Sequence, residues 1–222
     1  MRRLKLKPRA VIFDMDGVII DSMPYHFLAW YEALRAYGVR VSCFDVYTKE
    51  GENWQKTLKD LLIRAGLEPK ANLLKKIFIK RQEIFRFYFK RFIFKGAYEF
   101  LVCLKDKGYL LGLVTGSPSE EVGKILPSKI LSLFDALVAG NQVKRGKPHP
   151  EPYLKGAKSL GLAPSQCLVI ENAPFGIESA KKAGMFCVAL TTSLPEAYLK
   201  KADIVADNLS DISAIIEGTC KL

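Results

Sequence analysis

The chain has few of the residues that build zinc sites and disulfide frameworks. It contains two histidines, and its five cysteines lie far apart at Cys43, Cys103, Cys167, Cys187 and Cys220. Neither a CxxC motif nor a Cys/His cluster is present, which argues against a zinc or redox site and predicts reduced thiols in a cytoplasmic protein. No apolar run is long enough for a signal peptide or a membrane-spanning helix, so we expect no membrane partner.

Acidic residues are also scarce relative to basic ones. The 34 Lys and Arg residues outnumber the 23 Asp and Glu residues and give a net charge of +11. Much of the excess lies in residues 1–9 and in residues 70–95, where Glu83 is the single acidic residue. Aromatic and aliphatic residues recur at helical spacing in the second stretch, which predicts an amphipathic helix with a core-facing aromatic side and a solvated basic side. Two other roles for this basic stretch are an RNA-binding surface and an electrostatic field that attracts anionic substrates.

The length of 222 residues, 49% of them hydrophobic, suffices for one large core or for a core with a small second domain. Between about Met23 and Phe92 we predict no strand: helices are expected at 24–38, at 54–65 and across the basic stretch, with a loop at 39–48. Strands then alternate with helices, which predicts βαβ units and a parallel sheet. The expected strands are 10–13, 109–115, 136–139, 167–170, 186–190 and 203–205, and the expected helices are 97–107, 118–126, 150–160, 174–183 and one from about Ser210.

Two carboxylates, Asp14 and Asp16, follow the first predicted strand. The period-two alternation of a strand sends both side chains to the same side, at the end of a parallel strand where ligands bind in open α/β sheets. Two unit charges about 4 Å apart repel by roughly 4 kcal/mol at an effective dielectric constant of about 20. The pair therefore needs a proton, a cation or both.

Polar residues suited to phosphate chemistry follow three later strands: Thr115, Gly116 and Ser117, then Lys147 before a proline, then Glu171 and Asn172. Each set alone is also explained by helix capping or by a solvated lysine in a turn. Together they form a balanced set, in which Glu171 helps to bind a divalent cation that bridges Asp14 to a phosphate. Lys147 offsets the remaining negative charge, and magnesium suits these oxygen ligands.

These motifs resemble, in their order, those of the haloacid dehalogenase superfamily, specifically its phosphatase and phosphoglucomutase-like members with a helical cap inserted after the first strand. The resemblance runs from Val11 to about Asp207 and rests on Asp14-Met15-Asp16-Gly17-Val18, Thr115, Lys147-Pro148-His149-Pro150 and Glu171-Asn172. It implies an α/β fold with a Rossmann-like parallel-sheet core, helices on both faces and a small all-helical cap domain. The implied boundaries are 1–21 and 94–222 for the core and 22–93 for the cap.

The resemblance also implies a role for each motif residue. Asp14 is the expected nucleophile that forms an aspartyl-phosphate, and Asp16 is the expected proton donor and acceptor, with a backbone carbonyl on Mg²⁺. Thr115, Gly116, Ser117 and Lys147 are expected to bind the phosphoryl oxygens. Asp14, Asp16, Glu171 and Asn172 are the expected metal-site residues, and Asn172 stands where many relatives have Asp.

Cap residues bear on which reaction occurs. His26 and Trp30 lie in a segment similar to the cap entrance of beta-phosphoglucomutases and, with Glu52, are candidate substrate contacts; packing within the cap is the alternative for Trp30. The arginine expected in a mutase cap is missing from residues 50–54, and Pro118-Ser119 replaces the basic residue that follows the second motif in mutases. Both losses weaken a distal phosphate site and favour hydrolysis.

We therefore predict a cytoplasmic, magnesium-dependent phosphatase for a small phosphorylated metabolite, either a sugar phosphate or a phosphoglycolate-like compound, that acts as a monomer or weak dimer without nucleic acid. A hexose-phosphate mutase is the enzymatic alternative. The alternative of another class is a catalytically retired protein of this fold that binds nucleic acid through its basic surface.

Overall fold

The computed structural model describes residues 8–216; most of the basic N-terminal stretch and Cys220 lie outside them. A parallel six-stranded sheet with the order β3-β2-β1-β4-β5-β6 forms the core. Its strands are β1 (Ala10–Phe13), β2 (Leu110–Val114), β3 (Ala136–Val138), β4 (Cys167–Glu171), β5 (Phe186–Leu190) and β6 (Ile204–Ala206). β1 pairs with β2 and β4, so Phe13 lies between Leu113 and Ile170. The predicted α/β class with a Rossmann-like parallel sheet is confirmed.

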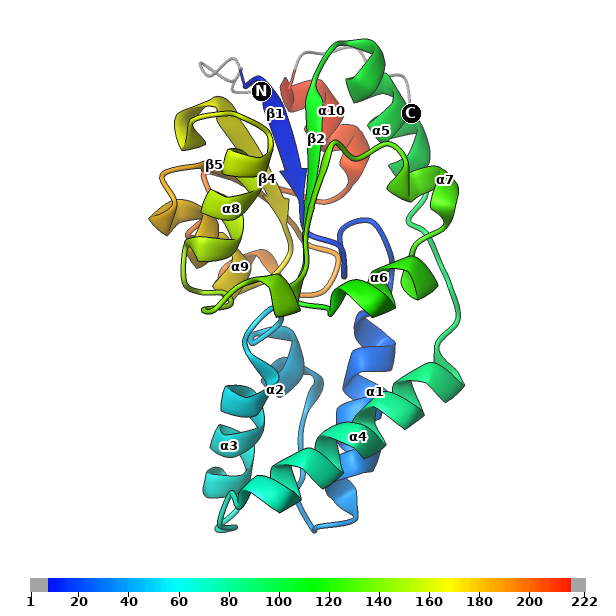
Figure 1. Ribbon diagram of the computed structural model, residues 1–222, viewed down its shortest axis with the longest axis vertical. Helices are drawn as coiled ribbons and strands as arrows, with labels where there is room; N and C mark the ends of the chain where they lie inside the picture. The colour runs from blue at the N-terminus through cyan, green and yellow to red at the C-terminus, as the bar shows by residue number, and fades with distance from the viewer. Residues whose placement is uncertain (1–7, 217–222) are drawn as a thin grey trace.

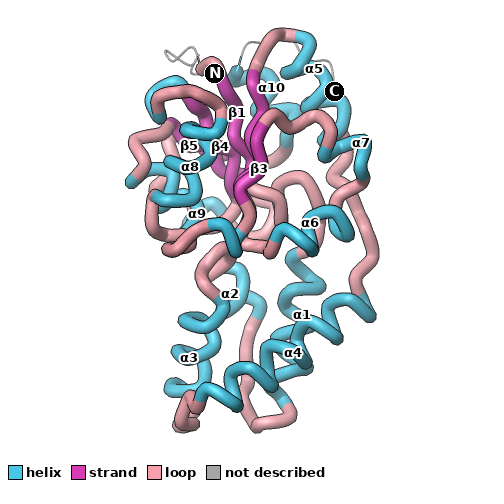
Figure 2. Tube along the Cα trace, in the orientation of Figure 1, coloured by secondary structure: helices cyan, strands magenta, loops and turns pink. Residues whose placement is uncertain are grey.

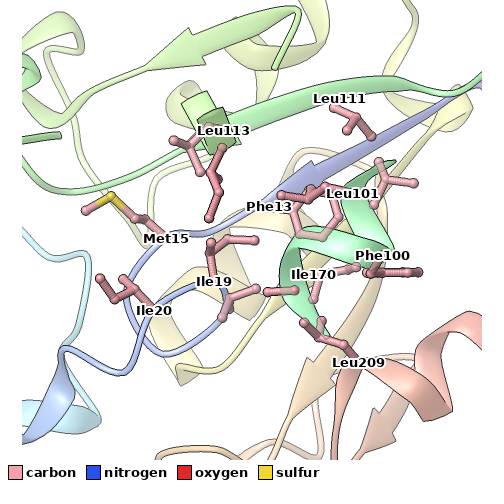
Figure 3. Packing of buried hydrophobic residues seen from close by; sticks show 14 of the residues in the cluster. Phe13, Met15, Ile19, Ile20, Phe100, Leu101, Leu111, Leu113, Ile170 and Leu209 are labelled. Carbon is pink, nitrogen blue, oxygen red and sulfur yellow. The ribbon is translucent and has the colours of Figure 1, made fainter. Parts of the chain in front are cut away.

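Alternate residues of β1 belong to two different hydrophobic clusters, which explains why the whole strand is apolar. Val11 and Phe13 pack in a cluster with helices α5 (Ala97–Asp106) and α10 (Leu209–Ile216) (Figure 3). Ile12 packs in a second cluster with helices α8 (Glu151–Ser159) and α9 (Pro174–Lys182). Helices therefore cover both faces of the sheet, as predicted (Figure 2).

Four helices are inserted between β1 and α5. They are α1 (Met23–Arg35), α2 (Cys43–Tyr47), α3 (Trp54–Arg64) and α4 (Ala71–Tyr88). The insertion has its own hydrophobic cluster, which includes Leu34, Leu58, Leu62 and Ile77. In Figure 1 it lies at the end of the sheet to which the β1 arrow points, so it covers the carboxyl ends of the central strands.

The structure corrects three local predictions. The expected loop at 39–48 contains α2, which begins at a capping box formed by Ser42 and Asp45. The basic helix ends at Tyr88, and the expectation of a wholly core-facing aromatic side is wrong: Phe87 and Phe92 are 81% and 61% exposed. Two short helices, α6 (Ser119–Ile125) and α7 (Ser128–Leu131), follow β2, and the second of them was not predicted.

The cysteines also differ from prediction in part. Cys43, Cys167 and Cys187 are free, but Cys103 is disulfide-bonded, so the prediction of a reduced thiol is wrong there. Disulfide formation depends on which Cα atoms the fold brings within reach, and spacing along the chain does not reveal this. Within residues 8–216, no helix combines the length and apolar character that crossing a membrane requires.

Candidate active site

The predicted motif residues meet at one edge of the sheet. Asp14 follows β1, Thr115 follows β2 and Glu171 ends β4, and these three strands are neighbours in the sheet. The fourth motif residue, Lys147, comes from the loop before α8. All four side chains are buried. The parallel order of the strands is therefore the reason that residues more than 150 positions apart become neighbours.

Lys147 bridges two carboxylates. Its ammonium nitrogen Nζ lies 2.6 Å from Oδ1 of Asp14 and 2.6 Å from Oε1 of Glu171. Burial alone would lower the pKa of Lys147, but the two carboxylates raise it above its ordinary value, so the side chain stays protonated. Burial raises the pKa of Asp14, and Lys147 opposes that shift. Lys147 thus supplies a permanent positive charge beside Asp14.

Glu171 accepts hydrogen bonds on both of its oxygens. Oε1 accepts from Lys147 and from the hydroxyl of Tyr153 at 2.7 Å. Oε2 accepts from the backbone N–H groups of Asn172 at 2.9 Å and Ala173 at 3.1 Å. These donors stabilise the ionised carboxylate and hold it in place beneath Lys147.

Asp16 is held by side chains from the start of the insertion and from the loop after β2. Its Oδ1 accepts from the Ser22 hydroxyl at 2.5 Å and lies 3.1 Å from Nε2 of His26. Its Oδ2 accepts from the Ser117 and Thr115 hydroxyls at 3.3 and 3.4 Å. Burial alone would raise the pKa of Asp16, but His26 and the Ser22 hydrogen bond lower it below its ordinary value.

An arginine in the helical insertion sets the orientation of His26. Arg81 on α4 donates to Nδ1 of His26 at 2.5 Å, which places the imidazole proton on Nε2, where it points to Asp16. The guanidinium lies over the rings of Trp30 and Phe85, 5.4 and 5.2 Å from their centroids. The insertion therefore contributes directly to the position of Asp16.

A glycine loop of the insertion contacts the sheet edge. Gly51 has a φ of +78°, and a Cβ atom there would lie 2.5 Å from Cδ of Lys147. A Cβ on Gly116 would lie 3.0 Å from Cα of Gly51, and the backbone of Glu52 pairs with that of Lys147. The positive φ favours glycine at position 51, and a side chain at position 116 would press on the backbone of Gly51.

A cavity of about 380 Å³ lies between the insertion and the sheet edge. Predicted site residues that line it are His26, Trp30, Glu52, Thr115, Gly116, Ser117 and Lys147. The carboxylate of Glu52 is turned toward α3, where it accepts from Lys56 and Thr57, each at 2.7 Å. Its predicted contact with substrate stays a prediction.

Sequence reasoning missed Ser22, Arg81 and Tyr153, each of which bonds to a predicted site residue or to its partner. For Arg81 a signal was present, because it lies four residues after Ile77 and four before Phe85, on the buried stripe of α4. For Tyr153 the corresponding signal is its place six residues after Lys147, in the first turns of the following helix.

The residues present fit a hard divalent cation. Oδ1 of Asn172 is buried and has no hydrogen-bond partner among residues 8–216, while Nδ2 of the same side chain donates to Ser193 at 2.8 Å. An unpartnered amide oxygen beside carboxylates is a suitable ligand for magnesium. A separate group of acidic and imidazole atoms, from Asp16, His26 and Glu50, lies within 4.8 Å. Both nitrogens of His26 are already engaged there, so the imidazole is not free to bind a metal.

Comparisons with known proteins show which family the chain resembles in sequence and in fold. The family model described as haloacid dehalogenase-like hydrolase matches residues 8–184 of this chain. The validoxylamine A 7'-phosphate phosphatase of Streptomyces hygroscopicus subsp. limoneus is 30% identical over 92% of this chain and 95% of its own length. The match to Protein SUPPRESSOR OF QUENCHING 1, chloroplastic, of Arabidopsis thaliana is 31% identical and covers 93% of this chain but 20% of that protein. The structure of a beta-phosphoglucomutase from Clostridium difficile superposes with a TM-score of 0.80 at 26% identity and covers 92% of this chain and 93% of that one.

Proposed function

This chain belongs to the haloacid dehalogenase-like hydrolase family, and we propose that it is a magnesium-dependent phosphatase for a small phosphorylated metabolite, either a sugar phosphate or a phosphoglycolate-like compound. The single observation that carries the proposal is the buried contact of Asp14 with Lys147, a residue that lines the cavity between the insertion and the sheet edge, together with a second buried aspartate held by Ser22 and His26. We also propose that residues 22–93 act as the cap over a core of residues 1–21 and 94–222.

In the proposed reaction, Asp14 attacks phosphorus with the carboxylate oxygen that Lys147 does not hold, and the bond from phosphorus to the leaving oxygen breaks. Because His26 and Ser22 lower the pKa of Asp16, the proton enters with the substrate: a phosphate monoester that binds as its monoanion transfers a proton to Asp16. Asp16 passes this proton to the leaving oxygen and then, as a carboxylate, takes a proton from the water that cleaves the aspartyl-phosphate. Lys147 and Thr115, with Gly116 and Ser117, bind the phosphoryl oxygens. Inorganic phosphate and the dephosphorylated alcohol leave.

The proposed cation site uses residues of the same edge. Asp14, the backbone carbonyl of Asp16, Glu171 and Asn172 would hold Mg²⁺. A bound magnesium ion supplies charge neutralisation for the transferring phosphoryl group.

The experiment that tests the proposal measures phosphate release from a panel of phosphorylated sugars, polyols and hydroxy acids, with magnesium and with EDTA. We expect turnover of at least one member that requires magnesium. Asp14→Asn should abolish this turnover and leave the circular dichroism spectrum nearly unchanged. Magnesium-dependent phosphate release by the Asp14→Asn protein would refute the mechanism.

A hexose-phosphate mutase is the second candidate, favoured by one observation. Arg81 is a cation that lines the cavity on the cap side, and a second phosphate group of a bisphosphate would bind there by replacing the contact of Arg81 with His26. Incubation with beta-glucose 1-phosphate and a bisphosphate primer separates the two reactions. A mutase forms the 6-phosphate, whereas a phosphatase forms free phosphate and glucose.

A further inference from the structure

Glu50 lies in the segment between α2 and α3 and lines the cavity. Two other carboxylates of the lining are neutralised by cations: Glu52 by Lys56 at 2.7 Å and Glu121 by Arg86 at 2.6 Å. Glu50 takes part in no salt bridge within residues 8–216; burial raises the pKa of its carboxyl group, and the charges of His26 and Arg81 oppose that rise. Its charge is therefore available to a molecule in the cavity.

The position of Glu50 relates it to one part of a substrate. Its carboxylate, a carboxylate oxygen of Asp16 and a ring nitrogen of His26 lie within 4.8 Å of one another. Asp16 is the proposed proton donor to the leaving oxygen, so Glu50 faces the first atoms of the leaving group beyond that oxygen. An ionised carboxylate accepts hydrogen bonds and donates none. An ionised Glu50 would therefore accept a hydrogen bond from a hydroxyl group there and repel a second carboxylate.

Arg81 does not reverse this selection. Its guanidinium donates to Nδ1 of His26 and lies against the rings of Trp30 and Phe85, on the far side of His26 from Asp16. Arg81 attracts the charge of Glu50 without forming a salt bridge to it. Glu50 is therefore the acidic side chain that lies next to Asp16 and to the leaving oxygen.

The remaining lining suits the same kind of leaving group. Trp54 and Phe78 both line the cavity, and their rings stack with centroids 3.8 Å apart. A flat apolar wall opposite a few polar groups is typical of a site that binds an organic molecule with both C–H and hydroxyl surfaces.

We propose that Glu50 selects a leaving group that carries a hydroxyl group next to the phosphate ester and rejects one that carries a carboxylate at that place. The inference rests on the proposed phosphatase function and narrows its substrate class to phosphorylated polyols and sugars. Phosphoglycolate-like compounds are then poor substrates.

The experiment compares two esters that differ in one group. 2-Hydroxyethyl phosphate has a CH₂OH group where 2-phosphoglycolate has a carboxylate. We expect kcat/KM of the unmodified protein to favour 2-hydroxyethyl phosphate by roughly 10-fold or more. Glu50→Gln removes the charge and keeps the shape, so it should shift this ratio roughly 10-fold toward 2-phosphoglycolate.

Two controls make the result specific. Glu83→Gln removes an exposed cap carboxylate from α4 and should leave the ratio unchanged. p-Nitrophenyl phosphate carries neither group, and its hydrolysis reports whether the Glu50→Gln protein is folded and active. If the Glu50→Gln protein hydrolyses p-nitrophenyl phosphate but keeps the original ratio of kcat/KM for 2-hydroxyethyl phosphate over 2-phosphoglycolate, the proposed role of Glu50 is overturned. The proposed phosphatase function is then unaffected. Absence of magnesium-dependent hydrolysis of all three esters by the unmodified protein would overturn the proposed function as well.

Discussion

Tyr153 donates its hydroxyl hydrogen to Oε1 of Glu171 over 2.7 Å, and no part of Tyr153 is exposed to solvent. Both residues contact Lys147, whose Nζ atom is 2.6 Å from Oε1 of Glu171 and 5.1 Å from the centre of the Tyr153 ring. Because Glu171 also accepts a hydrogen bond from Lys147, Tyr153 helps to fix the position of Lys147 by holding the Glu171 carboxylate. Because the low dielectric constant of the interior strengthens hydrogen bonds, the loss of one donor to a buried carboxylate is costly.

We expect Tyr153→Phe to lower kcat/KM for phosphate-ester hydrolysis roughly 10-fold, as for other residues that orient a charged site residue. It should also lower the free energy of unfolding by about 1.5 kcal/mol, because it removes a buried hydrogen bond to a charged group. Steady-state kinetics and urea denaturation measure the two effects. Tyr98→Phe is the matched control, because Tyr98 is partly buried in the other hydrophobic cluster, on the sheet face covered by α5 and α10. Unchanged kinetics in Tyr153→Phe would show that Glu171 holds Lys147 without its help.

Arg81→Met should reduce kcat more than it changes KM. The substitution keeps the aliphatic stem against Trp30 and removes the donor that sets the His26 tautomer, so Asp16 loses a fixed orientation. We expect a loss of roughly 10-fold or more in kcat, since general acid and base catalysis contributes about 100-fold or more. Lys80→Met removes an exposed cation from the preceding position of α4 and should change kcat little. Equal losses in the two variants would point to the overall charge of the cap and not to the tautomer of His26.

The capping box of α2 predicts a pH dependence of stability. Hydrogen bonds from Arg64 and Ser42 outweigh the effect of burial and lower the pKa of Asp45 from 3.8 to about 2. A carboxyl group whose pKa is lower in the folded state stabilises that state above pH 3.8, and this contribution is lost as the pH falls toward 2. Because Asp45 and Arg64 are partly exposed, we expect Asp45→Asn to cost about 1 kcal/mol at pH 7. Urea denaturation at pH 7, 5 and 3 measures the difference from the unmodified protein, which should shrink at the lowest pH. A difference that does not vary with pH would mean that shape and not charge accounts for the cost.

The regular part of the fold could be predicted because its signals are local. β1 and β5 have the predicted bounds, since a strand buried on both faces is a short apolar run that ends where polar residues begin. Helix α2 could not be predicted from periodicity, because it has five residues and depends on Ser42, Asp45 and the distant Arg64. The end of α4 was misplaced because the residues after Tyr88 continue its aromatic and basic composition while the chain leaves the helix.

The site divides in the same way. Asp14, Thr115 and Glu171 could be predicted because each follows a strand and the strands are neighbours. The contact of Arg81 with His26 joins residues 55 positions apart, across two helices of the insertion, and no local pattern encodes it. Glu50 likewise became a candidate only when the structure showed which carboxylates of the cavity have cationic partners. The phosphate-binding side of the site is thus the predictable part, and the leaving-group side depends on the packing of the insertion.

The unpartnered oxygen of Asn172 leads to the last prediction. Asn172 is buried beside Glu171 and offers Oδ1 as a neutral ligand, whereas an aspartate there would offer a charged one. Affinity for a hard divalent cation rises with the negative charge of its ligands, so Asn172→Asp should bind magnesium roughly 10-fold more tightly. Ser193 can rotate its hydroxyl to donate to the new carboxylate in place of accepting from Nδ2, so the fold is expected to remain intact.

Titration calorimetry with magnesium measures affinity without any turnover. Asn208→Asp, at the exposed start of α10, changes the net charge equally and should leave the affinity as it was. An equal affinity in all three proteins would place the cation away from residue 172 and leave Asn172 as a structural partner of Ser193.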